Sequence, residues 1–97
     1  MVAYIVFTRE KMRNGAEYDR YREKSRPVNA GHPLKALALY GHHETLEGPP
    51  IQGAVILEFP TMEAARAYYY SAAYQEAVRH RFLAADYRAF IVEGIQN

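Results

Sequence analysis

Residues 54–61 read AVILEFPT, and this stretch decides the fold. Residues 54–59 are apolar on both alternating faces for most of their length, which predicts a strand covered on both sides. Pro60 cannot continue a strand ladder, and Thr61 is a favourable N-cap. The stretch therefore predicts a buried strand that passes directly into a helix.

Three further stretches have strand character, being apolar at alternate positions or throughout: 2–8 (VAYIVFT), 35–40 (KALALY) and 88–95 (RAFIVEGI). Residues 2–8 are apolar on both faces, as residues 54–59 are, which predicts that these two strands lie in the centre of the sheet. The second strand is expected to continue through His42 and His43 to Leu46, before Gly48 and two prolines break the pattern.

The segment after the first strand has the signature of a helix. Asn14 is followed three residues later by Glu17, an Asn variant of the capping box. Tyr18 and Tyr21 continue at helical spacing, and Pro27 should bend or end the helix. Residues 9–26 contain seven basic and four acidic side chains, a mixture that we interpret as a solvated helix face with local ion pairs.

A second helical region follows Thr61 and extends to about Tyr87. It is rich in alanine, the strongest helix former. Ser71 can cap a new start, so we expect two pieces, 62–70 and 72–85.

The resulting order β-α-β-β-α-β predicts an α+β protein of ferredoxin-like fold, a single domain over residues 1–97 with a four-stranded antiparallel or mixed sheet. Right-handed crossovers place strands one and three in the middle. Both helical regions then cover one face, and the other face is apolar and bare. A monomer rarely exposes such a face, so we expect a homodimer formed through the sheet.

Composition excludes several classes of function. The formal charge of +1 gives no electrostatic case for nucleic acid, and the absence of cysteine excludes disulfides, thiolate nucleophiles and thiolate metal sites. No apolar stretch approaches the roughly 20 residues of a membrane span. We therefore expect a cytoplasmic protein with no membrane partner, no metal and no cofactor.

A series of short strings points to a family, and it is most specific in the second helical region: Leu46-Glu47-Gly48, Glu58-Phe59-Pro60-Thr61, Tyr69 with Ser71 and Tyr74, Arg81, and Val92-Glu93-Gly94. The series resembles the domain-of-unknown-function family 1330, in the dimeric α+β barrel superfamily. The resemblance implies two sheets facing each other as a barrel, and no agreed activity. Superfamily members include cofactor-free monooxygenases and isomerases, which share the fold but no catalytic set.

The first candidate site lies in the second helical region. On one continuous helix, Tyr70, Tyr74 and Arg81 would share a face, and phenols beside a guanidinium suit a carboxylate or enolate. The resemblance adds Tyr69 and Ser71 to Tyr74 and Arg81 as ligand-binding positions. The alternative is structural: the tyrosines pack in the core, Ser71 caps a helix, and Arg81 pairs with a surface acid.

Two residues are candidate proton carriers. Glu58 shares a strand face with Ala54 and Ile56 and is a candidate if that face lies inside a barrel, the alternative being a salt bridge at the rim. His42 is a candidate general base, the alternative being an exposed residue in a hairpin. His42 and His43 are neighbours on one strand and point to opposite faces, so they cannot share a metal.

Two hypotheses follow. The first is a homodimer that binds a small acidic or phenolic metabolite between the sheet and the second helical region, acting as a cofactor-independent enzyme if His42 or Glu58 carries a proton. The second is a dimerisation or ligand-sensing module without an active site. A cavity beside Arg81 would favour the first, and a solidly packed interior would favour the second.

Overall fold

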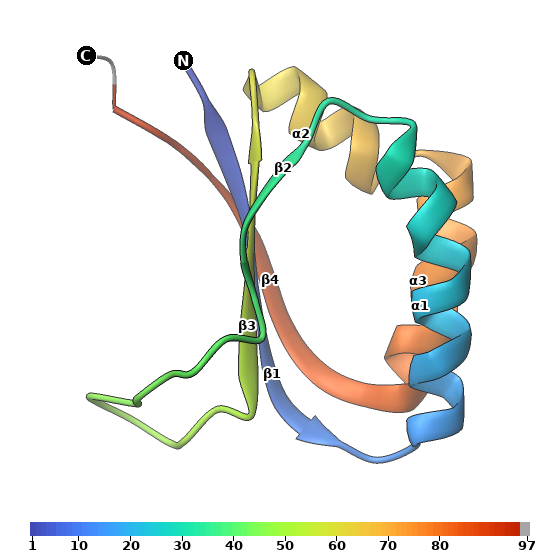
Figure 1. The fold of residues 1–97 in the computed structure, drawn as a ribbon, viewed down its shortest axis with the longest axis vertical. Helices are drawn as coiled ribbons and strands as arrows, with labels where there is room; N and C mark the ends of the chain where they lie inside the picture. Colours follow the sequence, from blue (N-terminus) through green and yellow to red (C-terminus); the bar gives the residue numbers. More distant parts are fainter. Residues whose placement is uncertain (96–97) are drawn as a thin grey trace.

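One sheet and three helices form two layers, with every helix on the same side of the sheet (Figure 1). The computed structural model describes residues 1–95, in which the elements are β1 (Ala3–Met12), α1 (Gly15–Ala30), β2 (Lys35–Leu39), β3 (Gly53–Phe59), α2 (Met62–Tyr69), α3 (Ala72–Ala84) and β4 (Ala85–Glu93). All neighbouring strands are antiparallel, in the order β2-β3-β1-β4. The ferredoxin-like α+β fold and the central positions of β1 and β3 are confirmed.

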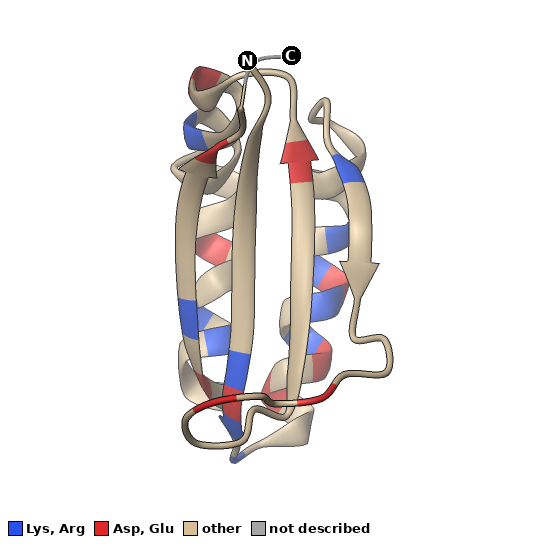
Figure 2. Ribbon diagram, turned by 90° about the vertical axis from the view of Figure 1, so that its left-hand side faces the viewer, with Lys and Arg blue, Asp and Glu red and all other residues tan. Residues whose placement is uncertain are grey.

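Alternation along the two central strands separates a covered face from an open face. Ala3, Ile5 and Phe7 of β1 are buried beneath the helices, and so are Val55, Leu57 and Phe59 of β3. Val6 points the other way, and it pairs with Ile56 on one side and with Phe90 on the other. Figure 2 shows the sheet from the side opposite the helices, so the open face is toward the viewer.

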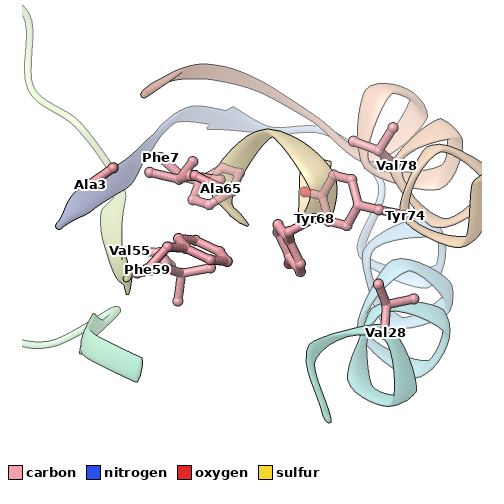
Figure 3. Close-up of a cluster of buried hydrophobic side chains, with 11 residues drawn as sticks. Ala3, Phe7, Val28, Val55, Phe59, Ala65, Tyr68, Tyr74 and Val78 are labelled. Atoms are coloured by element: carbon pink, nitrogen blue, oxygen red, sulfur yellow. The ribbon is translucent and has the colours of Figure 1, made fainter. Parts of the chain in front are cut away.

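Two tyrosines fill the centre of the core between the layers. Tyr68 and Tyr74 are 1% and 0% exposed, and their rings lie between the strand side chains and the α1 and α3 side chains in Figure 3. The Tyr68 hydroxyl donates to Asn29 Oδ1 at 2.5 Å, and the Tyr74 and Tyr21 hydroxyl oxygens are 2.8 Å apart. Each buried phenol is thus hydrogen-bonded, as a stable core requires.

The predicted continuation of the second strand to Leu46 is wrong. β2 ends at Leu39 because Tyr40 adopts φ 54°, a left-handed conformation that turns the chain out of the ladder. His42 and His43 therefore lie outside the sheet, in an exposed segment that leaves from its open side (Figure 1).

Other boundaries also differ from the predictions. α1 continues past Pro27 to Ala30, since a proline in the last turn removes a single helical hydrogen bond. β1 runs to Met12 rather than to residue 8, and β4 begins at Ala85 rather than at residue 88. These two strands extend their ladder together past a register shift between Arg9 and Lys11.

Candidate functional site: a cavity lined by arginine and tyrosine

A cavity of about 630 Å³ lies between the covered face of the sheet and the helices. Its volume falls within the range of small-molecule sites in proteins. All four strands and all three helices contribute residues to its lining. Its lining residues are Phe7, Arg9, Tyr18, Tyr21, Arg22, Ser25, Arg26, Asn29, Leu39, Tyr40, Val55, Leu57, Tyr68, Arg81 and Tyr87.

The lining is strongly biased in charge. Four of its fifteen residues are arginines and five are tyrosines, and the lining contains no aspartate, glutamate or histidine. The chain as a whole is nearly neutral, at +1. Positive charge is thus concentrated around a space that contains no compensating carboxylate, which favours an anionic occupant.

Arg81 is the most deeply buried arginine of this wall. It follows Tyr74, Ala77 and Val78 on the inward face of α3, at the spacing of one helical stripe. Its side chain is 2% exposed, and its Nε and Nη1 atoms are buried without a hydrogen-bond partner. Two charged donors therefore remain unused beside the cavity.

Aromatic rings rather than acids surround the Arg81 guanidinium. Its carbon lies 4.7 Å from the centre of the Tyr87 ring, 5.1 Å from Phe7 and 5.7 Å from Tyr21. The last turn of α3, where Arg81 lies, also favours a cation through the helix dipole. These contacts stabilise the charge only in part, because ring faces cannot satisfy the N–H donors.

A second cluster forms around Arg9 of β1. The Arg9 guanidinium carbon lies 4.8 Å from the Tyr40 ring centre and 5.6 Å from that of Tyr18. The Tyr40 hydroxyl is 2.6 Å from the Tyr87 hydroxyl. Arg9 Nε is also buried without a hydrogen-bond partner. The cavity therefore has a second arginine with an unused donor, held in an aromatic setting.

Glycine at position 53 makes room for this cluster. A Cβ atom there would lie 2.6 Å from Cδ1 of Tyr40, closer than non-bonded carbon atoms can approach. The Tyr40 ring consequently lies directly against the backbone of β3. The left-handed backbone of Tyr40 and the missing side chain at Gly53 together position one ring of the cavity wall.

Five tyrosines around the cavity and core are kept neutral. Burial raises the pKa of each above the ordinary value of 10.0, strongly so for all but the last of these: Tyr21, Tyr40, Tyr68, Tyr74 and Tyr87. Their hydroxyls thus stay protonated through the physiological range. A neutral phenol can donate a hydrogen bond to an anion, as a phenolate cannot.

These raised pKa values predict alkaline destabilisation. Since the folded pKa exceeds the unfolded value of 10.0, the phenols favour folding fully below pH 10, and that stabilisation is lost as the pH rises above 10. We expect the thermal midpoint to fall steeply there, with much of the tyrosinate absorbance appearing only upon unfolding. A native protein in which all nine phenols ionise near pH 10 would contradict the burial argument.

The structure places the predicted ligand-binding residues at different depths. Arg81 lines the cavity, whereas Tyr74 does not and instead contacts two lining residues, Tyr21 through its hydroxyl and Tyr68 through its ring. Tyr69 is half-buried, with its ring centre 5.2 Å from that of Tyr74. Ser71 caps α3, where its Oγ accepts from the Tyr74 backbone N–H at 3.1 Å. Of these four residues, only Arg81 lines the cavity.

The structure decides three points that the sequence leaves as a condition, an alternative and an interpretation. Tyr70 does not share a face with Tyr74 and Arg81, because the helix is interrupted between α2 and α3 and Tyr70 is 70% exposed. Arg81 is not paired with a surface acid in any ion pair of residues 1–95. Arg9, Arg22 and Arg26 line the cavity, so the charged run is not only a solvated helix face.

The two candidate proton carriers are not brought to the cavity. Glu58 pairs with Tyr4 on β1, on the open face, whereas its neighbours Leu57 and Phe59 point to the covered face. His42 lies in the exposed segment after Tyr40. Within one chain, neither Glu58 nor His42 is part of the lining that contains Arg81.

Several cavity residues were not singled out from the sequence. The sequence pattern predicts a first strand that ends at Thr8 and places Arg9 in a charged run, although Arg9 continues the parity of Ile5 and Phe7 on β1. Tyr87 was placed near a helix end, whereas it lies on β4, paired with Arg9. The excess of tyrosine, nine against four phenylalanines, was the signal that could have found this wall.

Two properties of the described residues, 1–95, concern metals and membranes. No group of three or more histidine, aspartate or glutamate side chains is placed to hold a metal ion. None of the helices in this range has the length and apolar character needed to cross a membrane.

The family model for a domain of unknown function (DUF1330) matches residues 2–95. The chain belongs to this family. The matched range includes every strand and helix described above, and thus the whole cavity wall. The family carries no assigned activity, and no curated protein matches the chain.

Solved structures share the fold of this DUF1330 chain. A protein of unknown function from Rhodopseudomonas palustris, RPA0582, is 21% identical with a TM-score of 0.77, over 99% of this chain and 84% of that one. A dimeric ferredoxin-like protein of unknown function from Thermobifida fusca is 13% identical with a TM-score of 0.65, over 97% and 92%. A candidate antibiotic biosynthesis monooxygenase from Nitrosomonas europaea is 13% identical with a TM-score of 0.58, over 97% and 89%.

Proposed function

We propose that this protein is a homodimer that binds a small organic anion in the cavity of each chain, with Arg81 holding the anionic group. The observation that supports this most directly is the buried Arg81 guanidinium, with two unpartnered N–H donors beside a cavity whose lining contains no acid. A carboxylate would bind one of these two donors together with the adjacent Nη2, because its two oxygens match the planar fork of arginine.

Energetics support a ligand at this point. An unpaired charge inside a protein costs several kcal/mol, and each cation–π contact returns only about 0.5–2 kcal/mol. A guanidinium with unsatisfied donors is therefore a poor choice for stability alone. A bound carboxylate would convert this cost into affinity, since charged hydrogen bonds contribute about 1.5–3 kcal/mol each.

The aromatic wall favours a flat ligand. The rings of Tyr21, Tyr87 and Phe7 surround the Arg81 guanidinium, and all three residues line the cavity. Aromatic faces pack well on flat, unsaturated molecules, and neutral hydroxyls donate to oxygen acceptors. A small aromatic acid fits this chemistry, as does a phenolic acid.

Binding is better supported than catalysis. Tyrosine and arginine can stabilise an enolate or phenolate, and the fold is shared with the candidate monooxygenase of Nitrosomonas europaea. Proton transfer from carbon needs a base, however, and the lining provides no histidine or carboxylate. Within one chain, Glu58 lies on the open face of the sheet and His42 lies outside the sheet, so neither supplies that base.

The open face of the sheet supports the homodimer. Ala38, Ile56, Val6 and Phe90 follow one another across the four strands in register, which makes one apolar stripe. Phe90 and Val92 on this face are 52% and 46% exposed. The structurally similar protein from Thermobifida fusca is described as dimeric. A second copy would cover the same stripe with an identical one.

Calorimetric titration with benzoate and benzamide tests the anion site. The two molecules have nearly the same shape, but only benzoate is charged. We expect benzoate to bind at least about tenfold more tightly, the factor that 1.4 kcal/mol provides, and to raise the thermal midpoint. Equal binding of the two, or no binding of either, would instead favour the alternative, a dimerisation module without a ligand site.

A further inference from the structure

We propose that the cavity recognises a flat ligand with two carboxylate groups, one held by Arg81 and the other by Arg9. This inference rests on the proposed anion-binding function and names the ligand class of the same site. Arg9 and Arg81 come from different elements, β1 and α3, yet both line the cavity and both have buried donors without partners.

Arg9 resembles Arg81 in its lack of an acidic partner. It takes part in none of the ion pairs of the described residues, 1–95. Its guanidinium instead contacts the rings of Tyr40 and Tyr18, at 4.8 and 5.6 Å. Glu10 follows Arg9 directly, at the register shift of β1, and it takes part in none of these ion pairs either. Arg9 is thus held in place while its charge stays uncompensated.

Tyr40, at the Arg9 end of the cavity, has a strained backbone conformation. Tyr40 is the one non-glycine residue with positive φ in the described range, at 54°. A bulky residue adopts this conformation at a cost of about 1–3 kcal/mol, and such strain is concentrated at functional sites. Here it directs the ring onto Gly53 and toward Arg9. Its hydroxyl is fixed by Tyr87, 2.6 Å away.

The two arginines are joined by one aromatic wall. Tyr87 contacts the Arg81 guanidinium with its ring and the Tyr40 hydroxyl with its own hydroxyl, and Tyr40 in turn contacts Arg9. Phe7, beneath Arg81, precedes Arg9 by two positions on the same face of β1. Residues two apart on a strand are separated by about 7 Å, so Arg9 and the ring that Arg81 contacts are neighbours along one strand face.

Titration with a series of simple acids tests this assignment. The probes are benzoate, benzene-1,3-dicarboxylate, benzene-1,4-dicarboxylate and phenyl phosphate, which places two charges on one group. We expect at least one dicarboxylate to bind about tenfold or more tightly than benzoate, since the second charged contact is worth at least 1.4 kcal/mol. Phenyl phosphate is expected to engage Arg81 alone.

The variant Arg9→Gln tests whether Arg9 and Arg81 bind different carboxylates of the ligand. We expect it to weaken the better dicarboxylate about tenfold or more, while benzoate and phenyl phosphate keep their affinity within about twofold. Arg79→Gln removes the same charge from an exposed position of α3 and is expected to leave all four affinities unchanged. Arg9→Lys, which keeps the charge, should restore part of the dicarboxylate affinity, and it replaces Arg9→Gln if that variant does not fold.

The contrary outcomes are distinct. If dicarboxylates bind no more tightly than benzoate, or if Arg9→Gln weakens benzoate or phenyl phosphate equally, the two-ended assignment is overturned while the Arg81 anion site stands. If none of the four acids binds the wild-type protein, the proposed function fails as well.

Discussion

Replacing Arg81 by methionine is expected to make the ligand-free protein more stable and to abolish benzoate binding. Methionine fills a similar volume without charge or donors. Replacing buried ionic groups with apolar ones of similar size can stabilise a protein by about 1–4 kcal/mol. The lost cation–π contacts with Tyr87, Phe7 and Tyr21 reduce this gain, so we expect about 1–2 kcal/mol.

Urea unfolding at fixed protein concentration measures this change, because a dimer's apparent stability depends on concentration. For a chain of 97 residues, 1 kcal/mol corresponds to about 4–8 °C in the thermal midpoint. The matched control is Arg79→Met on the same helix, where Arg79 is paired with Glu76 at the surface. We expect it to change stability by no more than about 0.5 kcal/mol.

The sign of the stability change decides the role of Arg81. A less stable Arg81→Met protein that still binds benzoate would assign the guanidinium to aromatic packing. It would also remove the main support for the ligand site. A gain in stability with loss of binding is the pattern expected of a residue retained for function rather than for folding.

Replacing Ile56 by glutamate is expected to dissociate the dimer into monomers. Ile56 lies in the apolar stripe of the open face, between Ala38 and Val6. In a two-fold interface the substitution would bury two carboxylates, one from each chain, without partners. At several kcal/mol for each buried charge, we expect the dissociation constant to rise at least about a thousandfold.

Light scattering after size exclusion measures the outcome. The wild-type protein should have about twice the chain mass of 11.1 kDa, and the variant should have the mass of one chain. Ala67→Glu introduces the same charge on an exposed position of α2 and should remain dimeric. A monomeric wild type would exclude the homodimer, and a dimeric Ile56→Glu protein would place the interface elsewhere. Neither outcome would affect the cavity argument.

Much of the fold could be predicted because local patterns specify it. The apolar runs at residues 2–8 and 54–59 identified the central strands, and the caps at Asn14, Thr61 and Ser71 all begin helices as expected. Asn14 and Ser71 each accept from a backbone N–H three residues later. Such signals depend on a few neighbouring residues, so a single sequence contains them.

The features that failed depend on distant parts of the chain. β2 ends where Tyr40 turns to meet Gly53 and Tyr87, neither of which is near it in sequence. The sequence points to Arg81, but its burial without an acidic partner follows from contacts with three other elements, β1, α1 and β4. The cavity is a volume between elements that are far apart in the sequence, so no local residue pattern predicts it. The position of Arg9 in the cavity lining could not be predicted, because a charged residue has the same sequence signal at the end of a strand as in a loop.

The tyrosine wall has an optical consequence. The chain contains no tryptophan, so its ultraviolet fluorescence comes from nine tyrosines, and five of these line the cavity. Emission from the wall will respond to any aromatic acid that stacks on these rings. The intrinsic tyrosine fluorescence of the unlabelled protein can therefore be used to follow ligand occupancy of the cavity.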